Sequence, residues 1–127
     1  MVLFVKSISE NRIILPLVDL AGDPIELNLR PTSRLLLEVA DQKGSLLLLK
    51  EASLSSSTDY LGVSYAQTVI TEEESSALLG AGRVHVWTLI HEYYVGDEDP
   101  PNPTSRRREV IAYGMLVCHQ VRTEPEE

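Results

Sequence analysis

The chain has 127 residues, a formal net charge of −8 and one cysteine, so we expect one domain and no intrachain disulfide. The negative charge argues against nucleic-acid binding, which needs a clustered positive surface, and no stretch reaches the roughly 20 apolar residues of a membrane helix. We therefore expect a soluble protein made in the cytoplasm, with one domain over residues 1–121 and a short acidic tail over 122–127.

The first half of the chain predicts short strands separated by turns. The opening apolar run, residues 1–6, is too short for the core of a signal peptide. Short apolar runs indicate strands over 11–18, 25–29, 34–40, 45–50 and 60–70. Pro16 predicts a sheet edge because proline cannot donate to a ladder, and the turn over 19–24 predicts that the first two strands pair as a hairpin. A serine-rich loop is expected over 53–58.

One short helix is predicted over residues 72–80. Thr71 and Glu74 have the spacing of a capping box, and three consecutive glutamates fall where the helix dipole favours negative charge. Gly80 or Gly82 is expected to end the helix. Because so short a helix is marginal on its own, we expect packing against the sheet to stabilise it.

A long C-terminal hairpin is predicted from the strand candidates 83–95 and 108–121. Both faces of the first strand carry large apolar groups, which predicts a central position in its sheet. The segment 96–105 contains three prolines and three acidic residues, which favours an exposed loop. About seven short strands with frequent turn signals and one minor helix predict an all-β fold, an antiparallel β-sandwich.

Four stretches resemble the N-terminal domain of phage baseplate upper proteins, an immunoglobulin-like sandwich found on virion appendages. They are VDLAGDPIEL (18–27), LLLEVADQKGSLLLL (35–49), ITEEESSALLGAGRVHVWTLIHEY (70–93) and REVIAYGMLVC (108–118). The positions on the helical motif of that family are Ile70, Thr71, Glu74, Leu78 or Leu79, and Gly82. The resemblance implies an immunoglobulin-like fold, a virion location, assembly with other virion proteins, and no catalytic residue or cofactor.

No group of side chains predicts catalysis or a metal site. His85 and His119 are expected to be diagonal neighbours across the hairpin, but zinc requires three or four ligands. Those two histidines and His91 are therefore expected to be ordinary sheet-surface residues. Cys118 lies in an apolar alternation, where cysteine usually acts as a small hydrophobe. The glutamates at 72–74 point in different directions on a helix, so capping explains them better than cation binding.

Aromatic residues with polar tips and the proline-rich loop predict an interaction surface. The candidate residues are Trp87, Tyr93, Tyr94, Tyr113, Pro100, Pro101, Pro103, Arg106 and Arg107. Trp87 fits equally well as the core tryptophan of a sandwich. We expect a non-enzymatic structural protein of a phage tail, baseplate or connector, which assembles with other virion proteins or with copies of itself. The alternatives are a monomeric carbohydrate- or peptide-binding module and, third, a small hydrolase whose acid–base pair the sequence does not reveal.

Overall fold

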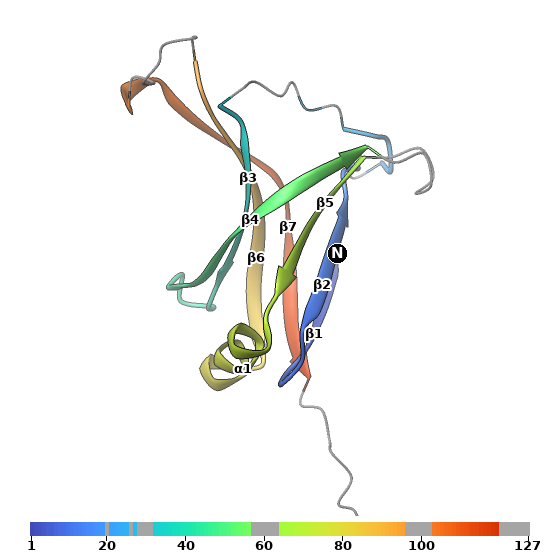
Figure 1. Ribbon diagram of the computed structural model, residues 1–127, viewed down its shortest axis with the longest axis vertical. Helices are drawn as coiled ribbons and strands as arrows, with labels where there is room; N and C mark the ends of the chain where they lie inside the picture. The colour runs from blue at the N-terminus through green and yellow to red at the C-terminus, as the bar shows by residue number, and fades with distance from the viewer. Residues whose placement is uncertain (20, 26, 28–31, 57–63, 96–102, 120–127) are drawn as a thin grey trace, which may run out of the picture.

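Seven strands form one mixed sheet in the computed structural model, which describes residues 1–119 except 20, 26, 28–31, 57–63 and 96–102. The strands are β1 (Val2–Lys6), β2 (Asn11–Pro16), β3 (Arg34–Ala40), β4 (Leu46–Ser56), β5 (Ser64–Ile70), β6 (Val84–Tyr94) and β7 (Arg106–His119). One helix, α1 (Glu72–Ala81), precedes β6, and a 3-10 turn, η1 (Pro103–Ser105), precedes β7. The sheet order is β1-β7-β6-β3-β4-β5-β2, and Figure 1 labels the strands in place.

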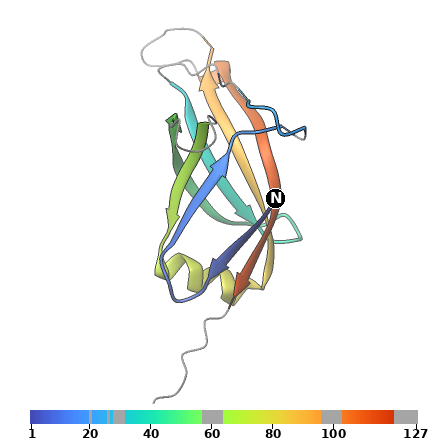
Figure 2. The ribbon, with the colours of Figure 1, turned by 90° about the vertical axis from the view of Figure 1, so that its right-hand side faces the viewer.

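The sheet curls until its two end strands, β1 and β2, meet near α1, so that it nearly closes into a barrel (Figures 1 and 2). The expected antiparallel immunoglobulin-like sandwich is therefore wrong, although the mainly-β class and the single short helix are confirmed. The reason lies in β4. Its first part pairs with β3 as far as Ala52, and its second part pairs with β5 from Ser53 onward. One continuous strand thus joins what would otherwise be two sheets. In addition, β1 runs parallel to β7.

Several expected elements change partner or length. The segment 11–18 was expected to pair with 25–29, but β2 pairs with β5. Among the described residues, the expected hairpin keeps the bridge between Val18 and Pro24 and the hydrogen bond from the Ile25 N–H to the Leu17 carbonyl. The expected serine loop is wrong over Ser53–Ser56, which belongs to β4. The edge position of Pro16 is confirmed because β2 ends the sheet.

The C-terminal hairpin is confirmed, because β6 pairs with β7 along its whole length, and β6 is an interior strand as expected. Most of the expected loop over 96–105 and the tail over 122–127 lie outside the described residues.

A side-chain amide joins the two ends of the sheet. The backbone N–H of Lys6 donates to Asn11 Oδ1 over 2.9 Å, and Asn11 Nδ2 donates to the Lys6 carbonyl over 2.8 Å. A primary amide carries both a donor and an acceptor, so it can replace the backbone partner that an edge residue would lack. Asn11 therefore holds β1 against the start of β2, in the place of a further strand.

Helix α1 covers the end of the barrel where β1 and β2 meet (Figure 2). Its capping box at Thr71 and its end at Gly82 are confirmed. Its buried residues are Ser75 and Leu78. The Ser75 hydroxyl is fully buried and bonds the Ser9 carbonyl at 3.0 Å, which attaches the helix to the β1–β2 turn. Leu78 is buried in the core beside it. The helix is thus stabilised by packing, as its short length requires.

The Trp87 indole fills the barrel interior, and a glycine makes room for it. Trp87 is 2% exposed and pairs with Gly114 across β6 and β7. A Cβ at position 114 would lie 2.9 Å from Trp87 Nε1 and would clash with the Met1 carbonyl oxygen. The indole N–H donates to that carbonyl over 3.2 Å. Gly114 therefore allows the ring and the start of β1 to approach the same point on β7.

We predict that Gly114→Ala destabilises the protein by about 2 kcal/mol, because the added methyl group overpacks this contact. Urea unfolding monitored by Trp87 fluorescence measures the change. Gly80→Ala is the matched control, since nothing lies within 4 Å of its Cβ and alanine favours a helix. It should leave stability unchanged or raise it. Equal stability of the two variants would contradict the close packing at Gly114.

We also predict that Glu74 makes stability fall in acid. Burial would raise the pKa of Glu74, but hydrogen bonds from Thr71 and the contact with Lys50 outweigh burial and hold the pKa below its ordinary value of 4.5. Its stabilising effect is thus present above about pH 4.5 and is lost as the pH falls through the lower, folded-state pKa. Glu74→Gln should lose less stability than wild type over that interval in urea titrations. An identical loss in both proteins would contradict this.

Candidate functional site

One outer face of the barrel carries apolar side chains in two aligned rows. Alternation along the strands turns one set of residues into the core and the other set outward. The register of β1, β7 and β6 aligns outward residues into one row of Val2, Met115 and Val86 and a second row of Phe4, Val117 and Val84. Tyr113 follows next along β7. We call these seven residues the β1–β7–β6 face: Val2, Phe4, Val84, Val86, Tyr113, Met115 and Val117.

Most of this face is open to solvent. Tyr113 is 73% exposed and Met115 is 48% exposed, and Val2, Phe4 and Val86 are also exposed. The ring of His119 stacks on Phe4 with centroids 5.2 Å apart, so the aromatic surface continues to the end of β7. A contiguous apolar patch on a soluble protein usually marks an interaction surface. The β1–β7–β6 face is therefore the strongest candidate site among the described residues.

The β1–β7–β6 face contains no carboxylate. Among the described outward residues of the three strands, from the Lys6 row to the Tyr113 row, the polar ones are Lys6, Thr88 and His119. The chain as a whole has 19 acidic residues, so their exclusion from this area is a specific feature of the surface. The face can approach another protein without burying an acidic group, which would cost free energy if left unpaired.

An ion-pair network borders the β1–β7–β6 face on the side of β3. Arg108 Nη2 lies 2.7 Å from Glu38 Oε1, and Arg108 Nε lies 3.4 Å from Glu92 Oε2. Arg34 approaches Glu92 at 3.9 Å and Glu51 at 3.7 Å. The two arginines thus neutralise carboxylates of neighbouring strands within one chain. The network limits the apolar face at this border.

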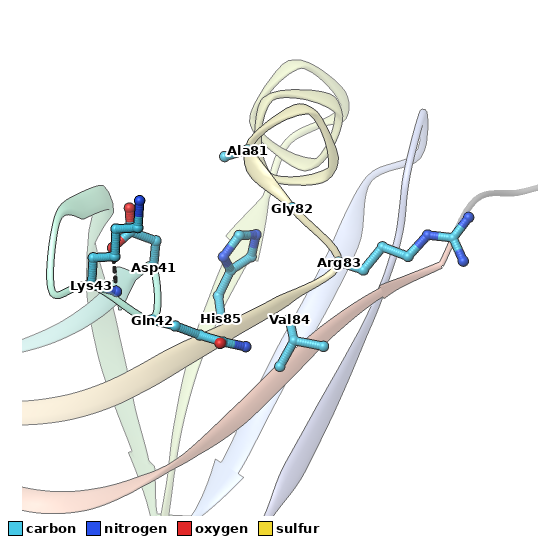
Figure 3. Close-up of a pocket in the computed structure, with 8 residues that line it drawn as sticks. All are labelled: Asp41, Gln42, Lys43, Ala81, Gly82, Arg83, Val84 and His85. Carbon is cyan, nitrogen blue, oxygen red and sulfur yellow. Dashed lines mark hydrogen bonds between the residues drawn. The ribbon is translucent and has the colours of Figure 1, made fainter.

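A separate pocket of about 480 Å³ lies where the β3–β4 turn approaches the end of α1 (Figure 3). It is lined by Asp41, Gln42, Lys43, Ala81, Gly82, Arg83, Val84 and His85. The Asp41 carboxylate accepts the backbone N–H groups of Lys43 and Ser45, each over 2.9 Å, so it serves the turn. In Figure 3, Asp41 and Lys43 lie together on the β3–β4 turn, whereas the Arg83 side chain extends away from them.

His85 forms the inner wall of this pocket, and its ring connects β6 to α1. The ring is 1% exposed, and Nε2 lies 2.8 Å from the Leu78 carbonyl oxygen. Since a carbonyl only accepts, Nε2 donates this hydrogen bond. Nδ1 is buried and has no hydrogen-bond partner among the described residues. We interpret His85 as a structural residue, because its contact with the Leu78 carbonyl joins β6 to α1.

A serine, a histidine and a glutamate meet at the opposite end of β6 from α1. His91 is buried, with Nε2 2.9 Å from Ser33 Oγ and Nδ1 3.8 Å from Glu109 Oε2. The Tyr93 hydroxyl donates to Glu109 Oε1 over 3.1 Å. This order of groups matches that of a hydrolytic triad, but 3.8 Å exceeds the length of a hydrogen bond. We interpret the cluster as the polar partners that a buried imidazole requires.

The expectations for the histidines and the cysteine have mixed outcomes. His85 and His91 were expected on the sheet surface, which is wrong because both are buried, whereas His119 is exposed as expected. The expected contact between His85 and His119 is also wrong. His85 pairs with Leu116 and points inward, so His119, three residues further, points outward. The small-hydrophobe role of Cys118 is confirmed, since the thiol is buried and burial raises its pKa.

The structure places the predicted interface residues at three locations. Tyr113 lies on the β1–β7–β6 face, whereas Trp87 lies in the core, the other position that the sequence allowed. The remaining described candidates lie around the end of the β6–β7 hairpin: half-buried Tyr93 and Tyr94, and exposed Pro103, Arg106 and Arg107. Pro100 and Pro101 lie outside the described residues.

The prediction from sequence missed Val2, Phe4, Val86 and Met115. The available signal was residues 2–5, where apolar residues occupy both sets of alternate positions, so one set must face outward.

Comparison with family models, with curated proteins and with solved structures finds no match. Within the described part of the chain, no helix is long and apolar enough to cross a membrane. The same residues contain no cluster of three or more histidine, cysteine or acidic side chains suited to a metal ion.

We predict that Ser33→Ala destabilises the protein by about 1–3 kcal/mol, because it removes a hydrogen-bond partner of the buried His91 ring. Chemical unfolding measures the loss. Ser76→Ala, on the exposed surface of α1, is the control and should be nearly neutral. Ester hydrolysis by the wild type that disappears in a folded Ser33→Ala variant would contradict the structural interpretation of this cluster.

Proposed function

We propose that this protein is a non-enzymatic structural component of a phage virion, which acts by docking through its β1–β7–β6 face. The observation that carries the docking role is the pair of apolar rows, exposed to solvent and free of carboxylates across three strands. A face of this kind gains free energy when another protein removes it from water. Catalysis would need convergent polar groups in a cleft, and the described polar clusters are used for turns, caps and buried rings.

Rigidity of the scaffold supports the same function. The face lies on a sheet that is curled, plugged by α1 and linked at its ends by Asn11. Outward side chains on paired strands keep fixed spacings, so the face can meet a neighbouring subunit with little loss of conformational entropy. A repeated assembly contact benefits from a surface held in this way.

The phage setting rests on the resemblance of four sequence stretches to baseplate upper proteins. Among them, the helical motif corresponds to α1, with a capping box at Thr71 and an end at Gly82, which the capping residues predict without reference to any family. The barrel differs from the sandwich of that family, so the likeness is local and consists of cap and turn motifs. The proposed location is the virion, and the proposed partners are other virion proteins and copies of this chain.

We predict that mass spectrometry detects this protein in purified particles of the phage that encodes it. When a phage that lacks the gene is complemented with the Met115→Lys variant, the amount of this protein in the particles should fall at least about tenfold, because a buried lysine opposes docking. Leu49→Lys is the matched control, since Leu49 is also 48% exposed but lies on β4, away from the face. Absence of the wild-type protein from particles would refute the virion role, and equal incorporation of both variants would refute docking through this face.

A further inference from the structure

We propose that the β1–β7–β6 face binds a second copy of the same chain, as a two-fold pair with antiparallel β7 strands. This inference rests on the proposed docking function and names its partner. The two-fold axis would lie in the plane between the two sheets, perpendicular to β7. It would pass over Leu116, midway between Tyr113 and His119. Two sheets packed face to face keep their strands within about 30° of one another, which this arrangement allows.

The register makes the face complementary to itself. Rotation about this axis places the row of Val2, Met115 and Val86 on the partner's row of Phe4, Val117 and Val84. On β7 and β6 the rows differ in exposure, because Met115 and Val86 are exposed whereas Val117 and Val84 are half-buried, and on β1 both Val2 and Phe4 are exposed. The rotation therefore places an exposed residue over a half-buried one on two of the three strands.

The aromatic ends of the face also match under the same rotation. Tyr113 and His119 are equally far from the axis on β7, so each lies over the other residue of the partner. Tyr113 is the most exposed residue of the face, and His119 already stacks on Phe4. Aromatic side chains bury large areas and favour offset or edge contacts with other rings. The pair would thus bury the most exposed ring of each copy.

Charge favours a copy of this chain over an acidic or basic partner. Each chain carries a net charge of −8, so most surfaces of two copies repel each other. The face avoids this repulsion because its residues include no carboxylate, and Glu38 and Glu92 at its β3 border are paired with Arg108. A strongly charged partner would find no complementary charged cluster on this face, since none of its seven residues carries a charge.

The size of the face predicts a weak pair. Three strands about 4.8 Å apart and seven residues at about 3.3 Å rise span roughly 14 by 23 Å, or about 300 Å² in projection. Stable interfaces bury about 800 Å² of accessible surface on each partner, so this one lies at the low end even with its rim. We therefore expect pairing that depends on concentration in solution and becomes stable when an assembly holds the copies together.

Sedimentation equilibrium of the full chain over a concentration series tests the pairing. The wild type and Leu49→Lys should rise from the 14.1 kDa of one chain toward twice that mass, whereas Met115→Lys should stay at one chain. A wild type that remains a monomer up to about 1 mM would overturn the inference, since that concentration is the limit of weak association. A dimer that survives in Met115→Lys would overturn it as well.

Cysteine cross-linking with a short bis-maleimide tests the orientation, because face-to-face sheets lie about 10 Å apart, which is too far for a direct disulfide. Met115→Cys and Val117→Cys lie in rows that the two-fold axis brings together, so an equimolar mixture should form mixed cross-links. Each variant alone should cross-link poorly, and buried Cys118 should not react. Preferential cross-linking of either variant with itself would overturn the antiparallel arrangement.

The two proposals can fail separately. A wild-type monomer combined with selective loss of Met115→Lys from particles would refute the second copy as partner but retain docking through the face. A wild-type dimer that is absent from particles would support the pair and refute the virion role.

Discussion

The structure depends on the point where β1 meets β2. A curled seven-stranded sheet has two ends, and the unpaired backbone of an end strand is exposed to water and to other chains. Here the Asn11 amide bonds both backbone groups of Lys6, and α1 attaches to the adjoining turn through Ser75. These contacts close the four-residue turn that joins β1 to β2, two strands that are separated by five others in the sheet order.

Closure decides which side of each strand faces the core. Once the sheet is curled, the inward positions of β6 must fill the interior, and Trp87 does so because Gly114 has no side chain to oppose it. The outward positions of β1, β7 and β6 are then left with apolar residues that the fold does not need to bury. We regard those residues as a surface for assembly because a retained apolar face lowers solubility unless a partner covers it.

Local signals in the sequence predicted local structure well. The α1 capping box and the β6–β7 hairpin were predictable because the residues that define them, such as Thr71 and Glu74, are close in sequence. The parallel pairing of Val2 with Met115 was not predictable, because it joins distant segments and leaves no local pattern. Similarly, the pairing of β2 with β5 replaces the nearer hairpin that the turn over 19–24 indicated.

The candidate site was predicted only in part for the same reason. Tyr113 could be identified as an exposed aromatic residue with a polar tip, whereas Phe4 joins it only through the pairing of β1 with β7. The burial of His85 and His91 could not be predicted either. The partners of His85 and His91, the Leu78 carbonyl and Ser33, come from other elements, so the sequence alone gave no reason to expect burial.

Native-state hydrogen exchange of the Lys6 amide tests the central claim most directly. Exchange protection reports how often a hydrogen bond opens. In the wild type the Lys6 amide should be protected, and in Asn11→Ala it should lose protection together with other β1 amides, while β3 and β6 remain protected. A Lys6 amide that exchanges as fast in the wild type as in Asn11→Ala would contradict closure of the barrel by Asn11.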